Sequence, residues 1–154
     1  MSRIEEKIKS MGLILPESSK PVAAYVPARK AGSIVYTSGQ LPMLDGKLTA
    51  EGIVGKNVTP EVAKAAALQC ALNGLAAIRG VIGDLDKIRS IVKVTCFVAS
   101  TPEFVSQPVI ANGASEFLLE VFGESGRHCR SAVGMACLPL NAPVEVELMM
   151  EVDD

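Results

Sequence analysis

The longest periodic pattern in the sequence lies between Thr59 and Gly83. Apolar side chains recur there at helical spacing, which predicts one helix with a buried face. Thr59 is suited to cap this helix, Pro60 fits its first position, and Gly83 provides the stop. A second helix is predicted from about Pro108 to Phe122, because apolar residues again form one stripe before a glycine.

Period-two alternation marks the strands that follow these helices. Ser90–Ala99 has one wholly apolar face and one mixed face, as expected of a strand. Arg130–Leu138 and Val144–Glu151 are predicted as two further strands, joined by a short proline-bounded connection.

The N-terminal part of the chain shows shorter patterns. Ile4–Ser10 predicts a short amphipathic helix, and Pro42–Asn57 is predicted as a loop because polar residues and glycines interrupt it. Val22–Val26 and Ser33–Thr37 are rich in β-formers, with Lys30-Ala31-Gly32 as the predicted hairpin turn.

Together these elements predict an α+β fold of order ββαβαββ, with a mostly antiparallel sheet and two long helices on one face. Residues 1–20 form an N-terminal extension with the short helix, and residues 21–154 form a single domain. Val133 and Met135 alternate with Ala136 and Leu138, so this strand is apolar on both faces. An uncovered apolar face favours a homo-oligomer that buries it.

Composition narrows the classes of function. The chain has 154 residues, of which 49% are hydrophobic and 21% charged, and its net charge is -2. Such a chain can bury a core, so intrinsic disorder is excluded. No uncharged stretch reaches the length of a membrane span, and no apolar signal core begins the sequence, so a cytoplasmic protein is expected. Without a basic run, a nucleic-acid partner is not expected.

The cysteines and the histidine do not form a metal-binding pattern. Cys70, Cys96, Cys129 and Cys137 match neither a C-x-x-C pair nor a zinc module, so reduced thiols and no metal are expected. The adjacent His128 and Cys129 would point to opposite faces of an extended chain. We therefore interpret them as an exposed imidazole beside a structural thiol.

Arg130 is the most informative charged residue. Small residues share its strand face, which leaves a hollow where a guanidinium could bind a carboxylate through two parallel hydrogen bonds. The alternative is a surface ion pair with Glu116, Glu120 or Glu145. Glu145 could instead position a water molecule, but a one-residue shift of register would move it to the other face.

These residues belong to a longer resemblance. From about residue 20 onward the chain resembles the Rid (YjgF-like) reactive-intermediate deaminases, also labelled endoribonuclease L-PSP. The resemblance rests on Ala24-Tyr25-Val26, the stretch from Val35 to Pro42 containing Thr37-Ser38-Gly39-Gln40, the strand Ile91–Val98, and above all the closing segments Arg130-Ser131-Ala132-Val133, Leu138-Pro139 and Val144–Glu147.

The resemblance implies a chorismate-mutase-like fold assembled as a trimeric barrel with clefts between subunits. It also implies hydrolysis of enamines and imines of the 2-aminoacrylate type to 2-oxo acids and ammonia, without metal or organic cofactor. By position, Arg130 would bind the substrate carboxylate and Glu145 would hold the attacking water. Tyr25, Ser38, Gly39 and Asn112 would bind substrate in the cleft.

Three departures from the family pattern keep other functions open. Arg130-Ser131-Ala132 replaces the usual Arg-x-Cys, His128-Cys129 precedes the arginine, and Cys137 stands in place of a common arginine. The alternative is therefore a non-catalytic module that binds small carboxylates or regulates other proteins. A third possibility, following the older family label, is a single-stranded RNA endonuclease or translation inhibitor.

Overall fold

The computed structural model describes residues 1–18, 20 and 24–154, and its centre is a five-stranded sheet. The strands lie in the order β1-β2-β7-β5-β6, and only the β5–β6 pair is parallel. The predicted α+β class and mainly antiparallel sheet are therefore confirmed. The five strands are β1 (Ala28–Ala31), β2 (Ile34–Thr37), β5 (Ile88–Ala99), β6 (Cys129–Met135) and β7 (Val144–Val152).

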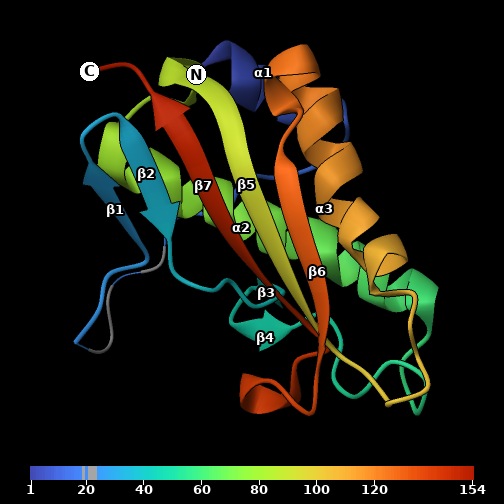
Figure 1. Ribbon diagram of the computed structural model, residues 1–154. Coiled ribbons are helices and arrows are strands. Elements are labelled where there is room, and N and C mark those ends of the chain that lie inside the picture. The colour runs from blue at the N-terminus through green and yellow to red at the C-terminus, as the bar shows by residue number, and fades with distance from the viewer. Residues whose placement is uncertain (19, 21–23) are drawn as a thin grey trace.

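Two long helices cover one face of the sheet and lie behind it in Figure 1. These are α2 (Pro60–Ile82) and α3 (Gln107–Phe122), close to the predicted bounds. Thr59 caps α2 through its side chain, as predicted. Although α2 is long and apolar enough to cross a membrane, it is the core helix of this domain, and its alanine-rich face lies buried against the sheet and α3.

The core contains two of the four cysteines. Cys70 on α2 and Cys96 on β5 are both fully buried. Burial raises the pKa of the Cys96 thiol to about 12 and raises that of Cys70 as well. Both groups are therefore neutral thiols at physiological pH.

The structure corrects several predicted boundaries. Val22 and Ala23 lie outside the described residues, and Ala24 and Tyr25 form a bend, so β1 begins only at Ala28. The hairpin turn falls on Gly32 and Ser33 rather than on Lys30-Ala31-Gly32. The strand predicted to reach Leu138 ends at Met135, before the short 3-10 helix Pro139–Asn141.

The predicted loop at Pro42–Asn57 contains a small hairpin. Its strands are β3 (Met43–Leu44) and β4 (Lys47–Leu48). Asp45 and Gly46 connect them, and both have positive φ angles (51° and 77°). Two successive positive φ angles are what a tight two-residue hairpin turn requires, and Asp-Gly is a preferred pair for it. Asp45-Gly46 therefore indicates a hairpin, which the prediction of a loop at Pro42–Asn57 did not include.

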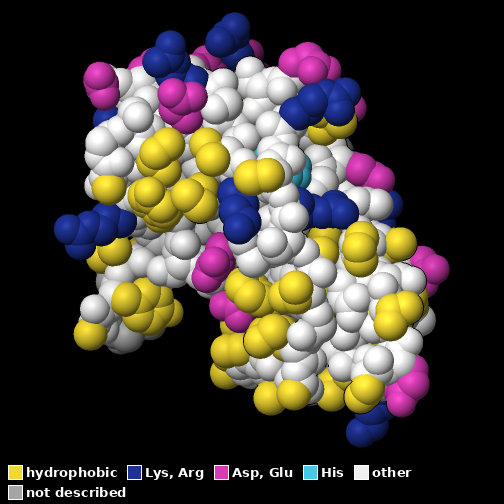
Figure 2. Space-filling model, viewed as in Figure 1, with side chains coloured by type: hydrophobic (Ala, Val, Ile, Leu, Met, Phe, Trp, Pro, Cys, Tyr) yellow, Lys and Arg dark blue, Asp and Glu magenta, His cyan; other side chains and the backbone are white. Residues whose placement is uncertain are grey.

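The described residues place no helix over the second face of the sheet. Figure 2 shows this face, on which apolar side chains form separate groups with charged side chains between them. Tyr36, Val133 and Met135 belong to this face and are 42%, 42% and 37% exposed. The expectation of helices on one face only is thus confirmed for a single chain.

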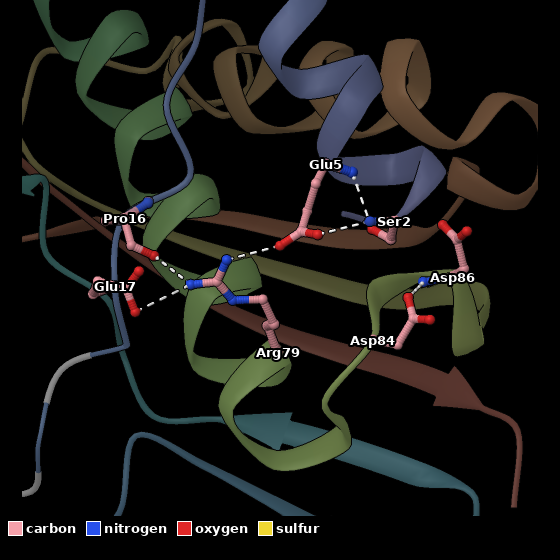
Figure 3. Close-up of polar contacts among 7 residues, drawn as sticks. All are labelled: Ser2, Glu5, Pro16, Glu17, Arg79, Asp84 and Asp86. Carbon is pink, nitrogen blue, oxygen red and sulfur yellow. Dashed lines mark hydrogen bonds and ion pairs between the residues drawn. The ribbon is translucent and has the colours of Figure 1, made fainter.

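Arg79 of α2 connects the N-terminal helix α1 (Arg3–Ser10) to the domain through hydrogen bonds (Figure 3). The Arg79 guanidinium donates to Glu5 at 2.7 Å and to the carbonyl oxygen of Pro16 at 3.2 Å. Ile8 of α1 is 1% exposed and packs into the core. The predicted N-terminal extension is therefore an integral part of the packed structure.

Replacing Arg79 by alanine should lower the free energy of unfolding by about 1–3 kcal/mol, because hydrogen bonds to a partly buried charge are lost. The matched control is Arg127→Ala, which breaks the exposed pair with Glu124 and should cost less than about 1 kcal/mol. Urea unfolding at neutral pH measures both variants, and equal losses would contradict this role for Arg79.

The loss in free energy of unfolding caused by Arg79→Ala should also depend on pH. The hydrogen bond from Arg79 lowers the pKa of the Glu5 carboxyl, so the folded state favours the ionised form. The resulting stability is present above the unfolded-state pKa and is lost as the pH falls through the folded-state pKa. The difference between wild type and Arg79→Ala should therefore shrink in acid.

Candidate functional site

Arg130 lies near the start of β6, on the side of the sheet that faces the helices. It pairs with Val94 of β5, which is fully buried beneath α2 and α3. Its Nη1 donates to Asn112 Oδ1 at 2.7 Å and to Ser115 Oγ at 3.1 Å. Asn112 and Ser115 are three residues apart on α3, so both project from the same side of that helix.

The ion-pair alternative for Arg130 is wrong. Glu116 pairs with Lys64, and Glu120 pairs with Lys7, each at 3.0 Å. Within the described residues, Arg130 forms no salt bridge, and its two side-chain partners are neutral. Its positive charge is therefore available to a ligand.

The guanidinium has donors left for such a ligand. Both of its hydrogen bonds use Nη1, and in the described part of the chain Nε and Nη2 have no partner. These two nitrogens lie on one edge of the guanidinium and can donate two parallel hydrogen bonds to the oxygens of a carboxylate. Arg130 lines an open pocket of about 270 Å³, together with Ser115, Glu116, Leu119, Gly126, Arg127 and His128.

His128 lines the same pocket, contrary to its interpretation as an exposed imidazole. The ring is half-buried, with Nε2 2.8 Å from Ser115 Oγ and Nδ1 2.6 Å from the carbonyl oxygen of Gly126. Cys129 points to the other face, as predicted from alternation, and its thiol donates to the carbonyl oxygen of Val92 at 3.1 Å. Sequence analysis missed Ser115 altogether, although its spacing from Asn112 placed both on one helix face.

Glu145 lies on the opposite face of the sheet from Arg130. Its neighbours Val144 and Val146 are fully buried beneath the helices, so Glu145 points the other way, beside Phe97 of β5. Half-burial raises the pKa of the Glu145 carboxyl, and the nearby Glu147 raises it further. The register left open by the sequence is thus resolved, and a single chain does not bring Arg130 and Glu145 together.

Of the other predicted residues, Ser38 and Gly39 lie on the segment that runs beside Glu145. Gly39 lies directly against its carboxylate, since a Cβ at this position would overlap the Glu145 oxygen. Gln40 pairs with Val146, the neighbour of Glu145, and holds this segment along β7. Ser38 donates to the carbonyl oxygen of Val26 at 2.7 Å, which ties it to the segment before β1. Tyr25, in the bend before β1, is 63% exposed.

The predicted site therefore forms two clusters. The guanidinium cluster contains Arg130, Asn112, Ser115 and His128, and the carboxylate cluster contains Glu145, Gly39 and Ser38. Among residues 1–18, 20 and 24–154, no three His, Cys, Asp or Glu side chains are grouped so that they could hold a metal ion. A larger pocket of about 380 Å³ lies near α1 and the end of α3, where its charged residues Arg3, Lys7 and Asp86 are already paired.

Comparisons with known proteins agree on the type of fold. Residues 5–152 match the family model described as "YjgF/chorismate_mutase-like, putative endoribonuclease". Protein TCP17 of Trypanosoma cruzi is 39% identical, over 99% of this chain and 96% of that protein. The 2-iminobutanoate/2-iminopropanoate deaminase of the mite Dermatophagoides farinae is 30% identical, over 90% and 93% of the two chains.

A solved structure resembles the chain over nearly its whole length. The crystal structure of an Agrobacterium tumefaciens protein of unknown function superposes with a TM-score of 0.93 and 47% identity. The match covers 98% of this chain and 93% of the other.

Proposed function

The chain belongs to the YjgF/chorismate-mutase-like family, and from this premise we propose that it hydrolyses small enamines and imines of the 2-aminoacrylate type to 2-oxo acids and ammonia. The observation that carries this proposal is the Arg130 guanidinium beside an open pocket, which is anchored through Nη1 and has no partner at Nε and Nη2 among the described residues. Similarity to the mite deaminase supports the same class of substrate.

Hydrolysis of an enamine or imine requires a few groups in fixed positions. An enamine first tautomerises to an imine, and the oxygen of a water molecule then bonds to the imine carbon. The carbon–nitrogen bond breaks after proton transfer to nitrogen, which releases ammonia and leaves the 2-oxo acid. Arg130 would hold the substrate carboxylate, and the Glu145 carboxylate would accept the proton from water. Its raised pKa makes Glu145 a stronger base once ionised.

We further propose that the site is completed by a second copy of the chain in a homotrimer. Arg130 and Glu145 lie on opposite faces of one sheet, so one catalytic unit needs Arg130 from one subunit and Glu145 from another. The open face, with Tyr36, Val133 and Met135 exposed, provides apolar surface for such an association.

Light scattering at micromolar concentration should give three times the 16.2 kDa mass of the chain. Val133→Glu should lower this mass and the activity together, because it places a charge on the apolar face. A wild-type mass equal to one chain would contradict both the trimer and the shared site.

The direct test of function is an assay of 2-oxo acid release from enzymatically generated 2-aminoacrylate and 2-iminobutyrate. Release faster than the uncatalysed rate, and lost in Glu145→Gln, is the expected result. Binding of a 2-oxo acid without acceleration would instead support the carboxylate-binding module, which Ala132 in place of the family cysteine favours. If the protein cleaves RNA instead, its affinity for RNA should fall steeply with added salt, since phosphate contacts release counterions.

Gly39→Ala should impair turnover without unfolding the protein. The added methyl group would meet the far end of the Glu145 side chain, which can rotate away, so stability should change by less than about 1 kcal/mol. The displaced carboxylate would no longer face its water, and kcat should fall by about a hundredfold. Assay and thermal melting measure the two effects. An unchanged kcat would remove Glu145 from the mechanism.

A further inference from the structure

The Arg130 guanidinium begins a series of three hydrogen bonds that ends at a backbone carbonyl oxygen. Arg130 Nη1 is 3.1 Å from Ser115 Oγ, Ser115 Oγ is 2.8 Å from His128 Nε2, and His128 Nδ1 is 2.6 Å from the carbonyl oxygen of Gly126. Ser115 and His128 are both half-buried, whereas Gly126 is buried.

For a neutral imidazole, the direction of every hydrogen bond in this series follows from its two ends. A carbonyl oxygen only accepts, so the proton of the neutral imidazole lies on Nδ1 and is donated to Gly126. Nε2 is then an acceptor, and the Ser115 hydroxyl donates to it. The lone pairs of Ser115 Oγ are left to accept from Arg130, which can only donate.

Side-chain packing does little to hold the guanidinium in place. The residues on its own strand face are Ala132 and Gly134, which offer it little contact surface. An arginine side chain has many rotamers, and ordering it on ligand binding would weaken affinity. The hydrogen bonds to Asn112 and Ser115 therefore determine where its free edge points.

We propose that Ser115 and His128 are positioning residues, which orient Arg130 so that its Nε and Nη2 face the pocket before a small carboxylate arrives. This proposal rests on the proposed function only for the identity of the ligand. His128 acts indirectly: it fixes the Ser115 hydroxyl, and the hydroxyl oxygen fixes the guanidinium.

The variants that test this proposal differ in one group each. Ser115→Ala removes the hydroxyl and Ser115→Thr keeps it. His128→Ala keeps the hydroxyl but removes the imidazole that accepts from it, together with the imidazole's bond to Gly126. The matched control is Ser106→Ala, at an exposed serine that begins the same helix and makes no capping bond through its side chain. Thermal melting of each variant reports whether the fold is retained.

Affinity for 2-oxobutyrate, measured by calorimetry on the assembled protein, is the first readout. Ser115→Ala should weaken binding by about tenfold, since one hydrogen bond to a charged group is lost. Ser115→Thr should restore most of the affinity, His128→Ala should give an intermediate loss, and Ser106→Ala should match wild type. If Ser115→Ala binds as wild type does, or if alanine and threonine weaken binding equally, the proposal is wrong.

A second readout needs no ligand. The Arg130 Nε–H signal in a nitrogen–proton NMR spectrum is assigned by its absence in Arg130→Lys, and its relaxation reports side-chain order. Relaxation should show an ordered Arg130 side chain in wild type and a mobile one in Ser115→Ala. If wild type fails to bind 2-oxobutyrate, the proposed ligand is wrong, whereas this signal still decides whether Ser115 positions Arg130. An ordered signal in Ser115→Ala overturns the proposal.

Discussion

Replacing Arg130 by alanine should weaken binding of 2-oxobutyrate by about 2–5 kcal/mol, the usual loss when one partner of a desolvated charge pair is removed. Folding should change little, because within the described residues the Arg130 side chain hydrogen-bonds only to Asn112 and Ser115 and forms no salt bridge. Calorimetry and thermal melting measure the two effects separately.

Arg130→Lys is the informative companion variant. An ammonium keeps the charge but cannot present two parallel donors, so it should recover only part of the affinity. Two results would contradict the prediction. Full recovery by lysine would show that charge alone suffices, and unchanged affinity with a large fall in melting temperature in Arg130→Ala would make the residue structural.

Gly113→Ala should be among the most destabilising small changes in the chain, with a loss of about 1–3 kcal/mol or more in the free energy of unfolding. Gly113 lies where α3 crosses α2, and a methyl group there would overlap the backbone carbonyl oxygen of Lys64. A backbone atom of a buried helix cannot move aside alone, so the two helices must separate. The clash opposes the ordinary gain in helix propensity from glycine to alanine.

Gly80→Ala provides the matched control within α2. Its added methyl group would meet only the Ser18 side chain, at 2.9 Å from Oγ, and this side chain can rotate. The variant should therefore be neutral or more stable by up to about 1 kcal/mol. Urea unfolding at fixed protein concentration compares the pair, since oligomerisation makes apparent stability concentration-dependent. Equal effects at both sites would rule out close helix packing at Gly113 as the cause.

The elements that could be predicted are those whose signals are local. Thr59, Pro60 and Gly83 define the ends of α2, because capping and helix termination depend on a few neighbouring residues. The alternation in β5 identified its buried face from Val94 to Val98. Nearer the start of the strand the alternation failed, because the register shift between Ile91 and Lys93 buries Ile91 in place of the predicted Val92. The N-terminal strand was placed too early, since β2 pairs with Ala28–Ala31, whereas Tyr25 and Val26 have no partner strand in the described part of the chain.

The candidate site depends on contacts that are distant in the sequence. The sequence by itself identified Arg130 and Glu145 through their surroundings and a family resemblance, and it identified the α+β class with one uncovered sheet face. It could not place the two residues on opposite faces, because only the register of β5 with β6 and β7 determines that. Ser115 and His128 were missed for the same physical reason: their contact exists only because packing brings α3 against the start of β6.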